Sequence, residues 1–251
     1  MKRRLVYFLA AVFLFGSLGA ADLTITFSSV RKGMIGAGTA GSEIHYYTSA
    51  DMMTRGVESG MDTLVAFQPG IIYTIDHKKR TITKLSFDDA LAAMESMNQP
   101  GNAGAAKMMA TMFGDPDNCK VTKVGNETIA GRNCQQWQIT VGKLVMDLSA
   151  DPTLKLPMPE TAYAQMMRTR AAQAAKAGPM GAIYKRLYEE MAKIKGIPLK
   201  THMSGMMGMD VSTLASKVEI GPVPGATFTL PDGFKVEDLG PKLKAQMAKS
   251  Q

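Results

Sequence analysis

A methionine-rich run near residue 205 holds the side chains whose types best suit metal chemistry. His202 is followed closely by Met203, Met206, Met207 and Met209. Thioether groups are soft ligands that suit Cu(I), and imidazole also binds copper, so one hypothesis is a methionine-based copper site. Methionine also fills irregular cores and adaptable apolar surfaces, and the chain contains 21 methionines. Packing is therefore the competing interpretation of the cluster.

The two cysteines, Cys119 and Cys134, are candidates for a disulfide. In an oxidising compartment a pair of thiols most simply forms one bridge. The segment between them is typical of a hairpin with a turn at Gly125-Asn126, so the bridge would join adjacent strands and contribute about 3 kcal/mol. A shared metal is the competing interpretation, but no C-x-x-C motif or nearby histidine completes such a site.

Catalytic motifs are missing from the sequence. It has no nucleophile elbow, P-loop or H-E-x-x-H pattern, and its histidines, including His45 and His77, lie far apart. A G-x-G-x-x-G run spans Gly36–Gly41, but alternating, strand-like sequence follows it instead of the helix that would meet a pyrophosphate. We therefore expect no cofactor, and a protein that is not an enzyme.

Residues 1–21 have the pattern of a secretory signal peptide. Lys2, Arg3 and Arg4 precede the uncharged run Leu5–Gly19, which is followed by small residues. This run is shorter than the 20 or so residues of a membrane span, so we expect a periplasmic mature chain without a transmembrane segment. Loss of the three basic residues lowers the formal net charge from +7 to +4, too small an excess to indicate nucleic acid binding.

The periodicity of the chain predicts strands first and helices later. From Asp22 to Ser86, apolar residues alternate with polar ones in six short runs separated by turn signals, which is typical of an antiparallel meander. The period then changes to 3.6 and predicts a helix with Met94 and Met97 on its apolar face. After further strands, a broken helical insertion is expected at about 160–195, with Met191 on an apolar stripe.

This order of elements indicates an α+β fold in which helices cover one face of an antiparallel sheet. The connections between the first six strands are too short for parallel crossovers, which excludes a doubly wound parallel sheet. We expect a single domain over residues 22–236 that contains the helical insertion, and a polar C-terminal tail over residues 237–251.

Four stretches of the sequence resemble a known family. They are, in order, Ile72–Thr83 (IYTIDHKKRTIT), Glu127–Cys134 (ETIAGRNC), Gly196–Thr201 (GIPLKT) and Phe228–Phe234 (FTLPDGF). With the export signal, they resemble an uncharacterised family of exported bacterial proteins whose fold is like that of the outer-membrane lipoprotein carriers and lipoprotein-sorting proteins. The resemblance implies a strongly curved antiparallel sheet that forms an unclosed barrel, or half-barrel. It also implies helices that act as a lid over a hollow for acyl chains or other apolar ligands. Because the matching stretches lie in turns and strand ends, they identify no ligand-contacting residue and give no information on catalysis.

Together these observations predict a periplasmic protein that binds a hydrophobic ligand, such as a lipid, acyl chain or lipoprotein, or an envelope protein, without chemistry. Met94, Met97 and Met191 are the candidates for the cavity wall or lid, because methionine adapts to ligands of different shape. The alternative function is a methionine-rich periplasmic protein that binds Cu(I) through the cluster at residues 202–209.

Overall fold

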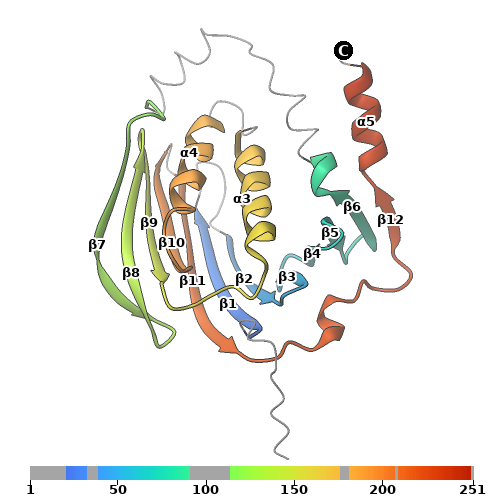
Figure 1. Cartoon of the computed structure of the whole chain (residues 1–251), viewed down its shortest axis with the longest axis horizontal. Coiled ribbons are helices and arrows are strands. Elements are labelled where there is room, and N and C mark those ends of the chain that lie inside the picture. The colour runs from blue at the N-terminus through green and yellow to red at the C-terminus, as the bar shows by residue number, and fades with distance from the viewer. Residues whose placement is uncertain (1–20, 33–38, 91–113, 176–180, 207–208, 250–251) are drawn as a thin grey trace, which may run out of the picture.

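The computed structural model describes residues 21–32, 39–90, 114–175, 181–206 and 209–249. In Figure 1 the strands form one bent sheet, and two helices lie inside the bend. The elements are β1 (Leu23–Lys32), β2 (Thr39–Tyr47), β3 (Asp51–Gly56), β4 (Met61–Ala66), β5 (Ile71–Asp76), β6 (Thr81–Ser86), β7 (Cys119–Ile129), β8 (Arg132–Val141), β9 (Leu144–Asp151), α3 (Glu160–Ala175), α4 (Gly181–Met191), β10 (Ile197–Met206), β11 (Met209–Ile220), the 3-10 helix η2 (Gly225–Phe228), β12 (Lys235–Asp238) and α5 (Gly240–Lys249).

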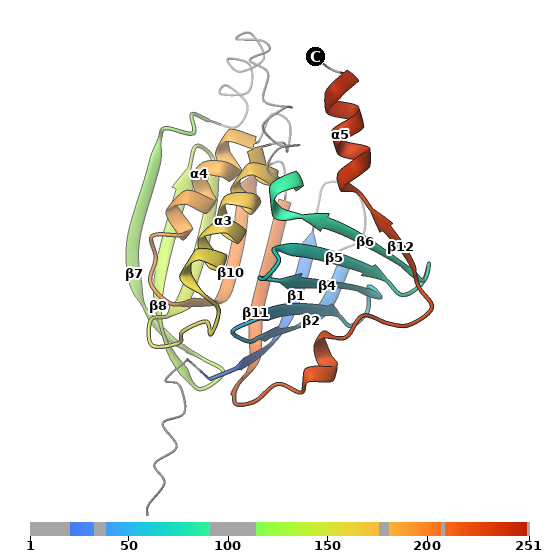
Figure 2. The same ribbon diagram turned by 45° about the vertical axis from the view of Figure 1, so that its right-hand side comes forward.

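The strands form one twelve-stranded sheet in the order β12-β6-β5-β4-β3-β2-β1-β11-β10-β9-β8-β7. All neighbours are antiparallel except β12, which pairs in parallel with β6. The edge strands β7 and β12 do not pair with each other, so the sheet bends strongly without closing (Figures 1 and 2). The predicted meander over β1–β6 and the predicted open, curved, mostly antiparallel sheet are confirmed.

The alternation in β1 shows how the sequence sets the faces of the sheet. Leu23, Ile25 and Phe27 are buried, whereas the intervening Thr24 and Thr26 are half-buried. Successive side chains of a strand point to opposite faces, so the three apolar residues share the inner face. They join a large core cluster with residues of β3, β4, β8 and α3.

The two helices inside the bend pack on a limited part of the sheet. From α4, Ile183 and Leu187 pack against a cluster on β8 and β9 that includes Ile139, Val141 and Leu144, and we call these residues the α4 cluster. α3 lies beside α4, whereas α5 stands at the far edge, next to β6 and β12 (Figure 2). The predicted cover of helices was overstated, because the described helices pack on only part of the sheet. Within the described residues, no helix is both long and apolar enough to cross a membrane.

The segment after β11 covers the other face of the strands β3–β6. It crosses the end of the sheet through η2. Its side chains Phe228, Leu230 and Phe234 pack on a third apolar cluster. The buried residues of that cluster are Met53, Leu64, Ile75 and Ile82. Because the neighbouring residues Met52 and Val65 belong to the core on the α3 side, these strands are buried on both faces.

Part of the predicted polar tail is ordered structure. Residues 237–249 contain the end of β12 and the helix α5. Lys244 Nζ of α5 lies 2.9 Å from Asp89 Oδ1, and Lys242 Nζ lies 3.4 Å from Glu237 Oε2. These ion pairs connect α5 to the first turn after β6 and to β12, which gives the lysines of this segment partners that the sequence pattern did not indicate.

The β7–β8 hairpin turns at Ala130-Gly131, where both residues have positive φ, 48° and 75°. Positive φ at two central turn residues is the geometry that matches the twist of a hairpin. The predicted turn residues Gly125-Asn126 instead continue β7 and pair with β8, directly after a bulge at Val124, where the strand register shifts between Lys123 and Gly125. The hairpin is therefore longer than the sequence pattern indicated.

This longer hairpin makes the predicted disulfide wrong. Cys134 lies opposite Glu127, which is eight residues along β7 from Cys119. At about 3.3 Å per residue the cysteines are separated by roughly 26 Å, whereas a disulfide joins Cα atoms less than about 7 Å apart. Both thiols are free in the structure.

Candidate binding groove on the outer face of the sheet

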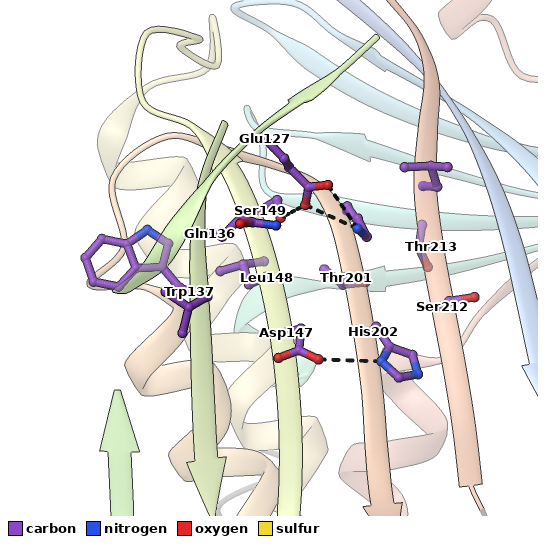
Figure 3. Close-up of a pocket in the computed structure, with 13 residues that line it drawn as sticks. Glu127, Gln136, Trp137, Asp147, Leu148, Ser149, Thr201, His202, Ser212 and Thr213 are labelled. Atoms are coloured by element: carbon purple, nitrogen blue, oxygen red, sulfur yellow. Dashed lines mark hydrogen bonds and ion pairs between the residues drawn. The ribbon is translucent and has the colours of Figure 1, made fainter. Parts of the chain in front are cut away.

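A groove of about 460 Å³ crosses the strands β7–β11. It lies on the face turned away from α3 and α4, which appear behind the sheet in Figure 3, and we call this the outer face. The side chains of its floor come from alternate residues of β8, β9, β10 and β11. Exposed residues of β7 and β11 stand at its two ends.

The strand register arranges the floor as two rows that cross the strands. In the first row, Gln136, Ser149, Lys200 and Leu214 are consecutive partners from β8 to β11. In the second row, the consecutive partners are Gln138, Asp147, His202 and Ser212. Residues two apart on a strand share a face, so both rows are presented on the outer face.

Two residues of the first row bind Glu127 of β7, and these contacts join three strands. Lys200 Nζ donates to both carboxylate oxygens of Glu127, at 3.2 and 3.0 Å, and the Ser149 hydroxyl donates to Glu127 Oε1. Burial by itself raises the pKa of Glu127, but hydrogen bonds from Ser149, Gln136 and Lys200, together with the Lys200 charge, lower that pKa below its usual range. Glu127 is therefore ionised at neutral pH and holds β7 against β9 and β10.

The second row places an imidazole between two carboxylates. His202 Nδ1 lies 3.6 Å from Asp147 Oδ2, and His202 Nε2 lies 3.3 Å from Asp210 Oδ1. Gln138 Nε2 also donates to Asp147 Oδ1 at 3.0 Å. Both carboxylates are about half-exposed; Asp147 lines the groove, and Asp210 lies beside it, next to the lining residue His202. Across the residues that the structure describes, no group of three or more His, Cys, Asp and Glu side chains is arranged to hold a metal.

Apolar side chains stand at both ends of the groove. Val124 of β7 is 57% exposed and Leu214 of β11 is 45% exposed. Trp137, the only tryptophan in the chain, lies at the β8 side (Figure 3), with Lys123 Nζ 6.0 Å from its ring centroid. Its Nε1 is shielded from solvent and has no hydrogen-bond acceptor among the described residues. The groove thus combines a charged floor with apolar ends.

The candidate cavity residues do not meet at a described hollow. Met94 and Met97 lie outside the described residues, and Met191 is partly buried against the α4 cluster. A second groove of about 430 Å³ opens near Cys134 and Pro152, next to the first. Neither of these two grooves is lined by a residue of α3 or α4.

The candidate copper ligands are divided between the faces of β10. Met203 packs against the α4 cluster on the inner face, whereas the adjacent His202 pairs with Asp147 and Asp210 on the outer face. Met206 and Met209 are strand partners at the β10–β11 end, and Met207 lies outside the described residues. The structure thus brings His202 to carboxylates, away from Met203.

Sequence reasoning missed the charged residues of the groove. Glu127 and Lys200 are 73 positions apart, and Asp147 and Asp210 lie on different strands. On each strand, the available signal was a polar residue at alternate positions, which any solvated strand shows. Only the order of the strands in the sheet places these residues side by side.

A family model described as "Domain of unknown function (DUF4412)" matches residues 47–234. No curated protein matches the sequence. Solved structures of similar shape include an uncharacterised conserved protein from Thermus thermophilus, with 8% identity, 87% of this chain and 91% of that chain covered, and a TM-score of 0.45.

Two further solved structures are similar to the chain. One is the MucA/MucB complex of Pseudomonas aeruginosa, with 11% identity, a TM-score of 0.44, and 86% of this chain but only 58% of that chain covered. The other is a LolA superfamily protein from Nitrosomonas europaea, with 9% identity, a TM-score of 0.34, and 84% of this chain and 91% of that chain covered. The family model covers most of the chain and confirms the resemblance to an uncharacterised family.

Proposed function

Because the chain belongs to the family described as Domain of unknown function (DUF4412), we propose its function from its own geometry: a non-enzymatic binding protein of the cell envelope. Its outer-face groove receives an extended segment of a partner protein. The observation that carries this proposal is the pair of polar rows across β8–β11, flanked by exposed Val124 and Leu214.

The composition of the groove suits a peptide better than an acyl chain. An acyl chain gains free energy from burial of methylene groups, about 0.8 kcal/mol each, and so needs a continuous apolar wall. The floor here presents Lys200, Asp147 and His202 in the centre and places apolar side chains at the ends. Protein interfaces mix apolar contacts with hydrogen bonds in this way. On the inner face, apolar side chains of α3 and α4 already occupy the contact with the sheet.

The contacts of the groove residues support a role without chemistry. Nucleophilic catalysis needs a base within hydrogen-bond reach of a serine, threonine or cysteine. The two ring nitrogens of His202 face Asp147 and Asp210, and the Ser149 hydroxyl is buried and donates to Glu127. The groove therefore offers fixed charges and hydrogen-bonding groups for recognition.

Placement in the envelope rests on the signal-peptide pattern of residues 1–21. Expression of the full chain in a Gram-negative host, followed by fractionation and intact mass measurement, tests it. We expect a periplasmic product that has lost these residues. A full-length product in the cytoplasmic fraction would contradict the placement.

The binding function is tested by selection from a displayed library of random peptides. We expect peptides that bind the purified protein and lose affinity for a Leu214→Lys variant. The matched control is Ile220→Lys, because Ile220 is also exposed on β11, at 57%, but lies outside the groove.

A parallel titration with fluorescent fatty acids tests the acyl-chain alternative. We expect no saturable binding that strengthens with chain length. The proposal fails if the library yields no peptide sensitive to Leu214→Lys, or if fatty acids bind with an affinity that rises with each added methylene.

A further inference from the structure

We propose that the segment received by the groove is basic at its centre and apolar at both ends, with its apolar side chains about six positions apart. This inference rests on the proposed function, which it makes more specific. It follows from three features of the outer face: its charge, its length and the direction in which it crosses the strands.

The charge at the centre of the groove is negative. Glu127 and Lys200 are paired and neutralise each other, which leaves the carboxylate of Asp147 in the groove and that of Asp210 beside it, on either side of His202. The whole chain has a formal net charge of +7, so this is a local reversal of sign. Charged groups across an interface are arranged with complementary potentials. A lysine or arginine side chain above His202 would meet both half-exposed carboxylates.

The length of the groove sets the spacing of the apolar side chains. Val124 and Leu214 stand on β7 and β11, which are separated by four strand spacings in the sheet. At about 4.8 Å per spacing the distance is roughly 19 Å. An extended chain advances about 3.4 Å per residue, so roughly five to six residues connect the two ends. Alternate side chains of an extended chain point to opposite sides, so a spacing of about six positions directs both apolar side chains at Val124 and Leu214.

The direction of the groove decides how the segment is held. The rows run across β8, β9, β10 and β11, as Figure 3 shows for Asp147, His202 and Ser212. A segment that lies along them crosses the strands, whose backbone groups already pair within the sheet. It is therefore held by side-chain contacts and not by addition of a strand to the free edge at β7.

The same charges disfavour anionic occupants. A phosphate or carboxylate headgroup would lie next to Asp147 and Asp210, and like charges at short range in a partly desolvated site repel. Among protein segments, acidic ones are disfavoured for the same reason. The groove thus selects for the charge of its occupant as well as for its shape.

Three fluorescein-labelled peptides of equal length test the proposal by fluorescence anisotropy. Each has two leucines six positions apart, and the central residues are lysine, serine or glutamate. We expect the lysine peptide to bind at least about tenfold more tightly than the glutamate peptide, and to weaken as salt is added. A double variant, Asp147→Asn with Asp210→Asn, should reduce this difference to about twofold or less.

Matched variants on β11 provide the controls. Leu214→Ser should weaken the lysine peptide about tenfold, whereas Ile220→Ser should not. Glu219→Gln removes an exposed carboxylate outside the groove and should leave the difference between the lysine and glutamate peptides unchanged.

Each contrary result identifies what has failed. If the serine or glutamate peptide binds as tightly as the lysine peptide and responds to Leu214→Ser, the basic centre is wrong while the proposed function stands. If all three bind and none responds to Leu214→Ser, the peptides bind elsewhere, for example at the edge of β7, and this inference is overturned. If none of the three binds but the library yields groove-dependent peptides, the stated pattern is wrong. If the library also yields none, the proposed function fails.

Discussion

Replacement of Asp151 by asparagine should destabilise the fold through one identifiable contact. The Asp151 carboxylate is almost fully buried at the end of β9 and accepts a hydrogen bond from Arg132 Nε at the start of β8. Its other oxygen accepts from the backbone N and the hydroxyl of Thr153, at 2.8 and 2.7 Å. This one side chain therefore joins the β7–β8 hairpin to the segment that leads into α3.

The expected loss follows from what asparagine can replace. Its carbonyl oxygen can still accept the two bonds from Thr153, but its NH2 group would face Arg132 Nε, which is also a donor. One charge-assisted hydrogen bond is lost, worth about 1.5–3 kcal/mol, and the guanidinium, 27% exposed, is left without its carboxylate. Loss of one partner of a fully buried pair costs about 3–5 kcal/mol. Because the Arg132 guanidinium is partly exposed and stays hydrated, we expect a smaller loss: Asp151→Asn should lower the free energy of unfolding by about 2–3 kcal/mol.

The effect should depend on pH in a defined direction. Burial by itself raises the pKa of Asp151, but hydrogen bonds from Thr153 and Arg132 and the Arg132 charge lower it below its usual range. A group whose pKa is lower in the folded state stabilises the fold above its unfolded pKa, about 3.9. That contribution is lost as pH falls through the folded pKa. The gap between wild type and variant is therefore full at pH 7 and narrows below about pH 4.

Urea denaturation at several pH values measures this gap. Asp232→Asn, at an exposed carboxylate, controls for the loss of one negative charge and should change stability by less than about 0.5 kcal/mol. A double-mutant cycle with Arg132→Gln isolates the pairwise coupling. An Asp151→Asn variant as stable as wild type at pH 7, or a gap that stays constant on acidification, would refute the reasoning.

Three further predictions follow from the geometry. Thiol titration of the denatured, unreduced protein should find both Cys119 and Cys134 free, and a titre of zero would restore the disulfide. Gly196→Ala should prevent stable folding, because Gly196 has φ +98° and a Cβ there would collide with the carbonyl oxygen of Asp151; a normal melting curve would contradict this. Leu187→Ala, in the α4 cluster, should cost about 2–5 kcal/mol in urea denaturation, and a loss below about 1 kcal/mol would show that α4 is weakly docked.

Local patterns predicted the local structure well. Alternation and turn signals over Asp22–Ser86 were enough to identify six strands, because each strand is short and is followed by a turn or a short connection. The helix start after Ser86 was also predictable: the Ser86 hydroxyl accepts a hydrogen bond from the backbone N of Asp89 at 3.0 Å, as an N-cap does. Both features depend only on residues close together in the chain.

Features that depend on distant segments were not predictable in the same way. The hairpin turn was misplaced because Gly125-Asn126 is a strong turn signal, yet both residues pair with β8 and lie within β7, after a bulge at Val124. Likewise, the apolar residues Phe228, Leu230 and Phe234 gave no sign that they cover β3–β6. The groove forms only because β9, β10 and β11 pair with one another, and the periodicity of a single strand does not indicate which strands will pair.

The return of the C-terminal segment to β3–β6 imposes an order on biogenesis. A ribosome makes β1–β6 first, but one face of β3–β6 stays uncovered until Phe228, Leu230 and Phe234 arrive, and β1 must wait for β11. Pairing between segments so distant in sequence slows folding and leaves apolar strands open to aggregation. A chain truncated before residue 225 lacks the side chains that cover this face, so its sheet stays unfinished and we expect it to aggregate.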